Sequence, residues 1–419
     1  MATKRTAIRR RLAVRSTAHR PPWSGRKGAG HRSIVAPLAA TIAATVAFGV
    51  GLALVRGGRE RVDARRRRAE SELGLAPGEP LAQGLRRMAL GQIDLALELL
   101  GDEDSAGGSG GYGTSAGRSG GYGTGAGAAG AHATGAGAVD EKAVHETRKA
   151  IKRLRALLRL LAHELPGKTF ARENAALRDT AGRLSGARDA EVMLATLDAL
   201  IARHPRGLGQ RDGVRKLRAR VLAERARVER LTLGDPATRA AVLFELRAFR
   251  ARVATWSLPE RGGMKLIEAD LDRLYAQGRA RYRRVARDMG NQVLAMHEWR
   301  KRVKDLRYAA EMLERRGSGK RLRRIARQAD ALGELLGEDH DLAVLAEHVR
   351  AGGRADGRAT WRTGRRTRKA LLKAIAKRRR KLRRRALRDG ERLYRARRKR
   401  FVRGVRAAYE SGRRASRLS

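Results

Sequence analysis

Two segments of the chain, separated by 152 residues, carry the same pattern of histidine, arginine and lysine. Residues 144–155 have the sequence VHETRKAIKRLR and residues 296–307 have the sequence MHEWRKRVKDLR. At the same offset, Arg188 and Asp189 in the first half of the chain correspond to His340 and Asp341 in the second half. A repeat of this length predicts a duplicated helical unit rather than two unrelated domains.

The spacing within each segment places the cations on one side of a helix. At 100° per residue, the cations of the first segment fall within a sector of about 120°. We call these residues the first stripe: His145, Arg148, Lys149, Lys152, Arg155 and Arg159. The opposite side of the same helix is apolar: Val144, Ile151, Leu154, Leu158 and Leu161. This helix should bury one face and present the other to a ligand.

The second segment carries an equivalent second stripe: His297, Arg300, Lys301, Lys304 and Arg307. Glu311 stands where the first stripe has Arg159, so the two stripes are not equivalent. One charged helix face is usually only solvated. Two copies in one register favour a binding surface, because a solvated face does not require the same residues twice.

The charge of the chain restricts its partners. Lysine and arginine total 95 against 43 acids, which gives a formal net charge of +52. Self-repulsion of this size favours association with a polyanion: nucleic acid, anionic lipid or free polyphosphate. Aromatic residues make up only 4% of the chain, too few for a protein that stacks many unpaired bases. The absence of cysteine excludes disulfides and thiolate zinc sites.

The N-terminal part divides into three segments. Residues 1–33 are rich in cations and contain no acid, which predicts a disordered basic arm. Residues 34–55 carry no charge and are long enough to span a bilayer. Their weak hydropathy leaves two alternatives open, a membrane anchor or a packed or loosely ordered helix. Residues 56–78 form a basic connector.

The remainder of the chain is predicted to be helical, with one interruption. A helix should begin at Pro80, and residues 104–138 form an inserted loop rich in glycine. Residues 140–350 consist almost wholly of helix-forming residues. Leucines and aromatic residues remain spaced for helices up to about Val405, and residues 410–419 form a basic tail. The predicted fold class is all-α.

The two histidine segments resemble those of the CHAD family, the conserved-histidine α-helical domain. The resemblance runs from about Glu79 to about Tyr409 and includes SGARDAEVML and LGEDHDLAVL. It implies two four-helix units related by pseudo-twofold symmetry, a basic surface, and binding of inorganic polyphosphate. The loop at 104–138 and the first 78 residues depart from the family core.

We therefore expect both stripes to bind polyphosphate without catalysis, cofactor or metal. Arg188, Arg395 and Lys399 are weaker candidates for the same surface. His145 and His297 could contact phosphate, transfer protons or support local packing, and phosphate contact is favoured. Asp189 and Asp341 are better explained as helix caps or structural ion pairs than as groups that orient a ligand-binding cation.

Two other functions remain as alternatives. The first is a nucleoid or RNA-associated protein that binds backbone phosphates without reading sequence. The second is an enzyme that acts on polyphosphate or a triphosphate, although the sequence shows no metal-binding motif. We expect a cytoplasmic protein associated with polyphosphate granules or the nucleoid, or one anchored to a membrane by residues 34–55.

Overall fold

A computed structural model describes residues 63–64, 73–101, 141–184, 186–232, 235–259, 262–288, 291–314, 320–351, 354–355, 358–359 and 364–418. The chain divides into two units, and all of these residues belong to the second, Arg56–Ser419. The predicted arm at 1–33, the apolar segment at 34–55 and the loop at 104–138 lie outside the described residues.

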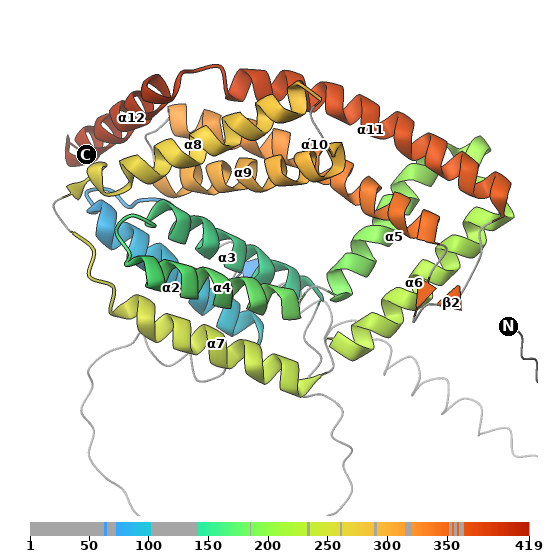
Figure 1. Ribbon diagram of the computed structural model, residues 1–419. Coiled ribbons are helices and arrows are strands. Elements are labelled where there is room, and N and C mark those ends of the chain that lie inside the picture. The colour runs from blue at the N-terminus through green and yellow to red at the C-terminus, as the bar shows by residue number, and fades with distance from the viewer. Residues whose placement is uncertain are drawn as a thin grey trace, which may run out of the picture. The chain divides into compact units, whose positions relative to one another are not determined.

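Four helices from the first half form a bundle (Figure 1): α2 (Leu81–Leu99), α3 (Glu141–Leu160), α4 (Gly167–Arg183) and α7 (Pro236–Ala254). Helices α2 and α4 each pack against both α3 and α7. Pro80 directly precedes α2, as predicted. The apolar residues spaced for this helix are all buried: Leu81, Leu85, Met88, Ile93, Ala96 and Leu100.

The second half forms a similar bundle from α8 (Lys265–Ala286), α9 (Gln292–Leu313), α10 (Lys320–Ala351), α11 (Arg365–Leu393) and α12 (Arg398–Leu418). Helix α9 packs between α8 and α10, while α11 and α12 both contact α8 and α10. In both halves the histidine helix packs against the helix before it and the helix after it. The all-α class is confirmed, and the twofold relation between the halves stays a prediction.

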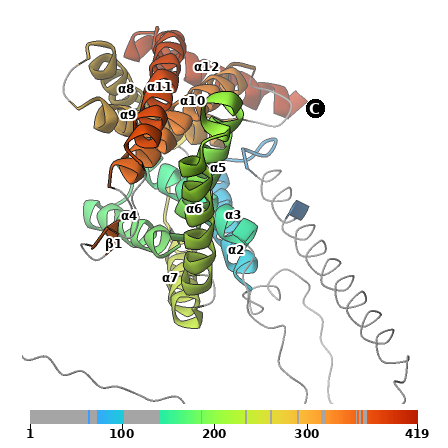
Figure 2. The ribbon, with the colours of Figure 1, turned by 90° about the vertical axis from the view of Figure 1, so that its right-hand side faces the viewer.

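A helical hairpin extends from the first bundle to the second. It consists of α5 (Gly186–Ala202), the π-helical turn η2 (Pro205–Gly209) and α6 (Asp212–Thr232). It packs against the C-terminal part of α10 and the N-terminal part of α11 (Figure 2). Residues from all of these elements form a separate hydrophobic core: Leu197, Leu200, Leu208, Leu217, Leu345, Leu371 and Ile375. The hairpin therefore joins the two halves at one end.

The two histidine helices, α3 and α9, contact each other where the bundles meet. Leu154 and Leu306, the identical leucines of the repeat, are each 1% exposed and belong to the main hydrophobic core. The predicted apolar face of α3 is buried throughout: Val144, Ile151, Leu154, Leu158 and Leu161. The repeat thus places both of its histidine helices at the centre of the fold.

Side-chain caps define where two of the helices begin. The Asn291 side chain accepts hydrogen bonds from the backbone nitrogens of Val293 (3.0 Å) and Leu294 (3.2 Å), at the start of α9. Asp235 caps α7 in the same way. These caps satisfy backbone donors that a helix end otherwise leaves unpaired.

The chain joins the packed core slightly before the predicted boundary at Glu79. Leu75 is fully buried, and its backbone nitrogen donates to the carbonyl oxygen of Glu314 at 2.9 Å. Gly74 has a φ of +109°, and a Cβ at this position would lie 2.8 Å from the same carbonyl oxygen. Only glycine fits this approach without strain. At the other end of the chain, α12 continues to Leu418, through most of the predicted basic tail.

Outside the helices, the described part contains two short strands, β1 (Arg354–Ala355) and β2 (Arg358–Ala359), which pair antiparallel. They lie between α10 and α11 in the sequence. Within the described part, no helix combines the length and the apolar character needed to cross a bilayer.

Candidate functional site

The N-terminal half of the first stripe lies beside α5. Arg148 is half-buried, and its guanidinium lies 3.9 Å from the carboxylate of Asp189 on α5. The Lys149 ammonium lies 3.4 Å from the buried carboxylate of Glu146. Lys152, one turn further along, is exposed. The ion pair with Asp189 agrees with the structural role favoured for that aspartate.

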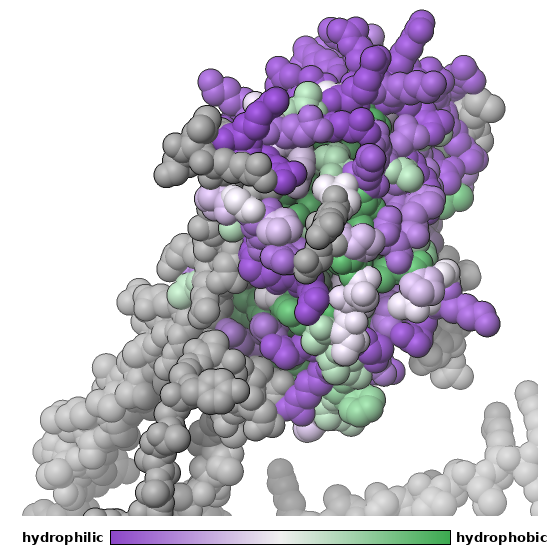
Figure 3. All heavy atoms as spheres, turned by 90° about the vertical axis from the view of Figure 1, so that its left-hand side faces the viewer, coloured by the Kyte–Doolittle hydropathy of each residue, from purple (hydrophilic) through white to green (hydrophobic). Residues whose placement is uncertain are grey.

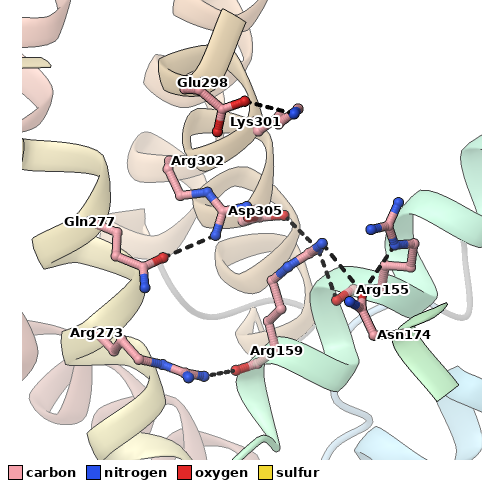
Figure 4. A network of polar contacts seen from close by, with 9 residues as sticks. All are labelled: Arg155, Arg159, Asn174, Arg273, Gln277, Glu298, Lys301, Arg302 and Asp305. Carbon is pink, nitrogen blue, oxygen red and sulfur yellow. Dashed lines mark hydrogen bonds and ion pairs between the residues drawn. The ribbon is translucent and has the colours of Figure 1, made fainter. Parts of the chain in front are cut away.

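The C-terminal half of the first stripe is enclosed between helices instead of facing solvent (Figure 4). Arg159 donates to Asp305 of α9 at 3.1 Å, and Arg155 donates to Asn174 of α4 at 3.1 Å. Burial and the nearby Arg159 lower the pKa of Arg155 to about 10. The helical spacing predicted one open face, but α4 and α9 cover the end of it.

Asp305 is the centre of a polar network between the bundles. Arg302 lies 3.1 Å from its second carboxylate oxygen and also donates to Gln277 of α8 at 3.0 Å. Arg273 of α8 donates to the backbone carbonyl of Arg159 at 3.1 Å. Burial raises the pKa of Asp305, against the lowering effect of its arginine neighbours. The network connects α3, α8 and α9, as Figure 4 shows.

The second stripe faces α10. The rings of His297 on α9 and His340 on α10 have centroids 4.5 Å apart. Burial, followed by the neighbouring His340 and Lys301, lowers the pKa of His297 to about 4. Burial together with Arg300 and Lys304 lowers the pKa of His340 to about 4 as well. Both imidazoles are therefore neutral at pH 7.

Two nitrogens of this surface are buried without a hydrogen-bond partner among the described residues, Nε of Arg300 and Nδ1 of His297. The Arg300 guanidinium lies against Gly337 of α10. Burial and the charge of Arg300 lower the pKa of Lys304 to about 8, although Glu334 and Asp341 act in the opposite direction.

The other two cations of the second stripe have acidic partners. Lys301 donates to Glu298 at 2.7 Å on the exposed side of α9. Arg307 donates to Glu311 at 2.6 Å and also pairs with Asp330 of α10. Glu311, the departure from the first stripe, therefore helps to neutralise the end of the second stripe.

The structure describes the side chains of two of the three weaker candidates. The Arg188 side chain is outside the described part of the chain. Arg395 and Lys399 are exposed at the junction of α11 and α12. In Figure 1, α12 lies at one end of the described part. Helix α5, whose Asp189 pairs with Arg148, lies toward the other end.

Two arginines of α11 attach this helix to α10 beside the second stripe, and sequence reasoning did not select them. Arg378 makes two hydrogen bonds to Glu338, at 2.7 and 2.6 Å. Arg379 makes two to the buried Asp339, at 2.9 and 3.0 Å. Arg379 also contributes to the low pKa of His340. His340 itself was visible in the sequence only as the counterpart of Arg188 in the repeat.

The fold and the site define a class: an all-α protein in which each half contributes one basic histidine helix to a central contact. A family model described as the CHAD domain matches residues 128–350, a range that contains both histidine helices. This range is more than half of the chain, and the chain belongs to the CHAD family.

A solved structure gives a second comparison. The crystal structure of the CHAD domain from the plant Ricinus communis aligns with 17% sequence identity and a TM-score of 0.46. The alignment covers 73% of this chain and 89% of the plant chain. No curated protein matches the chain. Among the described residues, no group of three or more histidine, aspartate or glutamate side chains could hold a metal ion.

Proposed function

We propose that this chain binds inorganic polyphosphate along the surface between α9 and α10 and does not process it. The observation that carries the proposal is a pair of buried side-chain nitrogens there that lack hydrogen-bond partners. The buried Nε of Arg300, a donor, and the buried Nδ1 of His297 find no hydrogen-bond partner among the described residues. Leaving a buried donor unpaired is costly, and a phosphate oxygen would satisfy it.

The lowered pKa values support the same proposal. Burial and positive neighbours lower the pKa values of His297 and His340, which keeps both imidazoles neutral at pH 7. Burial and Arg300 likewise lower the pKa of Lys304 to about 8. An anion placed among these groups would raise all three pKa values, because it favours their charged forms. Binding of an anion here would therefore be coupled to uptake of protons by these groups.

The chemistry of polyphosphate fits this surface. It is a flexible chain with about one negative charge per phosphate, and its affinity comes from charge-assisted hydrogen bonds and counterion release. Cations fixed one helical turn apart, about 5.4 Å, can contact successive phosphates without ordering a long loop. Such a ligand offers no base edges, and the surface has no aromatic stacking residue in either stripe.

The first stripe would contribute its N-terminal half. Arg148, Lys149 and Lys152 precede the enclosed part of α3, and α5 beside them packs against α10. Arg155 and Arg159 would act indirectly, because their hydrogen bonds hold α3 in place: Arg155 donates to Asn174 of α4, and Arg159 donates to Asp305 of the other histidine helix, α9.

The site of action in the cell is a separate proposal. A polyphosphate-binding protein of this kind would work in the cytoplasm, at polyphosphate granules or the nucleoid. Residues 34–55, outside the described part, would attach it to a membrane if they form an anchor. Fractionation of cells that express the full chain, with and without residues 34–55, would separate these two locations.

The test of the proposed ligand is selectivity. In about 0.15 M salt, long-chain polyphosphate should bind the full chain more tightly than duplex DNA at equal phosphate concentration. Isothermal titration of each ligand into the protein gives the two affinities directly. Equal or weaker binding of polyphosphate would overturn the assignment and favour the nucleic-acid alternative.

A further inference from the structure

Helix α11 carries a concentration of positive charge that is used only in part by the fold and is not part of the polyphosphate surface. Its 24 residues from Arg365 to Arg388 contain 14 lysines and arginines and no acid. The helix lies outside the range matched by the family model, which ends at residue 350. Figure 1 shows it along the outer edge of the second bundle.

The cations of α11 divide into a group that faces neighbouring elements and a group that faces outward. Three are half-buried and pair with carboxylates of neighbouring elements: Arg378 with Glu338 and Arg379 with Asp339 of α10, and Arg383 with Asp288 in the turn after α8. The other 11 are exposed, and none of them forms an ion pair with a described residue. Packing therefore explains the inward cations and leaves the outward ones without a structural role.

Seven of the exposed cations follow one line along the helix. At 100° per residue they fall within a sector of about 100°, opposite the buried Leu371, Ile375 and Leu382. We call them the outer stripe: Arg366, Lys369, Lys373, Lys377, Arg380, Arg384 and Arg388. At 1.5 Å per residue the outer stripe is about 33 Å long, with one cation per helical turn.

The outer stripe by itself destabilises the helix that carries it. Like charges three and four residues apart repel each other on a helix surface. Apolar packing of Leu371, Ile375, Leu382 and Ala386 keeps α11 helical in spite of this repulsion. A polyanion laid along the outer stripe would remove the repulsion.

The properties of the outer stripe favour a rigid polyanion. It contains no aromatic side chain for stacking unpaired bases, and the apolar face of α11 is already buried in the core, so it is not available to enter a bilayer. A straight array of fixed charges suits a duplex, which presents one phosphate charge per about 1.7 Å of its axis. Figure 3 shows the face of the molecule on which α12 lies in Figure 1. Hydrophilic side chains dominate the upper part of that face.

We propose that the outer stripe of α11 is a separate binding surface for double-stranded nucleic acid, which contacts backbone phosphates without reading sequence. This surface is independent of the polyphosphate site between α9 and α10. The chain would then hold two polyanions at once, a flexible one at its centre and a duplex on its outside.

The test uses the full chain and a variant with four central cations of the outer stripe replaced by alanine: Lys373, Lys377, Arg380 and Arg384. A matched control removes four exposed cations that lie outside α11 and outside the helices of the polyphosphate surface: Lys168, Lys216, Arg247 and Lys265. Both variants lose the same charge. Melting temperatures show that each is folded, and the outer-stripe variant should be at least as stable as wild type because repulsion is relieved.

Binding is measured to a mixed-sequence DNA duplex of about 20 base pairs, two turns of B-DNA, over a range of salt concentrations. The outer-stripe variant should bind at least about tenfold more weakly than the control, and its slope of log K against log salt should fall by about 3. Both variants should bind a defined short-chain polyphosphate as wild type does.

Three results would overturn the proposal. Equal loss of duplex binding in the outer-stripe variant and the control would show that only net charge matters. A loss of binding to anionic lipid vesicles without a loss of duplex binding would assign α11 to a membrane. An equal loss of short-chain polyphosphate binding would make α11 part of the central site. Failure of the polyphosphate proposal would instead appear as weak polyphosphate binding by wild type.

Discussion

At the scale of single residues, Asp305 differs most from its counterpart in the other half. The repeat aligns it with Arg153, a buried arginine that donates to Gln92 within its own bundle. Asp305 instead accepts from Arg159 and lies near Arg302, so it connects α3 to α9. The sequence shows the departure from the repeat, but it could not show which arginines would surround the aspartate.

Replacing Asp305 with alanine should destabilise the protein by about 3 kcal/mol, because it leaves buried arginines without their carboxylate. Asp179→Ala is the matched control, since Asp179 pairs with Arg178 on the exposed surface. The control should leave the free energy of unfolding close to that of wild type. Urea denaturation measures both, and equal effects would contradict the central role of Asp305.

Lys304 gives the polyphosphate surface a dependence on pH. Its pKa of about 8 is below the ordinary value, and bound phosphate would raise it. The bound state therefore holds the proton more tightly than the free state, and affinity falls as the pH rises through 8. Between pH 7 and 9 wild type should lose about tenfold in affinity for polyphosphate.

A Lys304→Arg variant is the control for this pH dependence. Its guanidinium stays charged throughout the range, so its affinity should change little between pH 7 and 9. Titration of both proteins at the two pH values makes the comparison. The same pH profile for both would show that Lys304 does not contact the ligand.

At the scale of elements, the sequence predicted that the described part is helical, but it did not predict where packing divides that part into separate helices. The 3.6-residue periodicity predicted helices from Pro80 onward, and the structure confirms them. The break between α4 and α5 has no equivalent in α10, which is continuous. Gly186 is the first residue of α5, and its counterpart in the repeat is Glu338, within α10. The Arg378 side chain donates a hydrogen bond to Glu338. That contact comes from α11, distant in the sequence, and periodicity alone does not predict it.

The two stripes also show what helical periodicity cannot predict. Helical spacing correctly separated the apolar face of α3 from its cations. It could not show that α4 and α9 enclose Arg155 and Arg159, because the position of neighbouring helices is a tertiary property. The His297–His340 contact also depends on packing, although the repeat marked both residues.

Gly390 determines how closely α11 approaches α9. A Cβ at this position would lie 2.5 Å from the ring of the buried Trp299 and 2.9 Å from Tyr282. Gly390→Ala should therefore destabilise the protein by about 1–3 kcal/mol through overpacking. Gly182→Ala in α4 is the control, because a Cβ there meets nothing within 4 Å.

The control should be neutral or slightly stabilising, since alanine favours helix over glycine by up to about 1 kcal/mol. Thermal unfolding of the two variants compares them under the same conditions. A neutral Gly390→Ala variant would show that α11 and α9 are less tightly packed than the structure indicates.

At the scale of the whole molecule, the proposal assigns binding without turnover. Incubation of the full chain with polyphosphate and magnesium or manganese should release no phosphate above a buffer blank. Malachite-green detection over several hours is sensitive enough for slow hydrolysis. Steady release that disappears in a His297→Ala variant would replace the binding assignment with an enzymatic one.

The central claim is that the cations of the two histidine helices form the polyphosphate surface, and the salt dependence of affinity tests it most directly. Two triple-alanine variants remove these cations: Arg148, Lys149 and Lys152 from α3, and Arg300, Lys301 and Lys304 from α9. A third variant removes three exposed cations that lie outside α3, α9 and α10 as a charge-matched control: Lys168, Arg247 and Lys265. Melting temperatures are recorded for all.

Affinity for long-chain polyphosphate is then measured over a range of salt concentrations. Each stripe variant should bind more weakly, with a slope of log K against log salt reduced by about 2, because three fewer counterion-releasing contacts form. The control should keep the slope of wild type. If both stripe variants are folded and bind as the control does, the histidine helices are only solvated faces and the account is wrong.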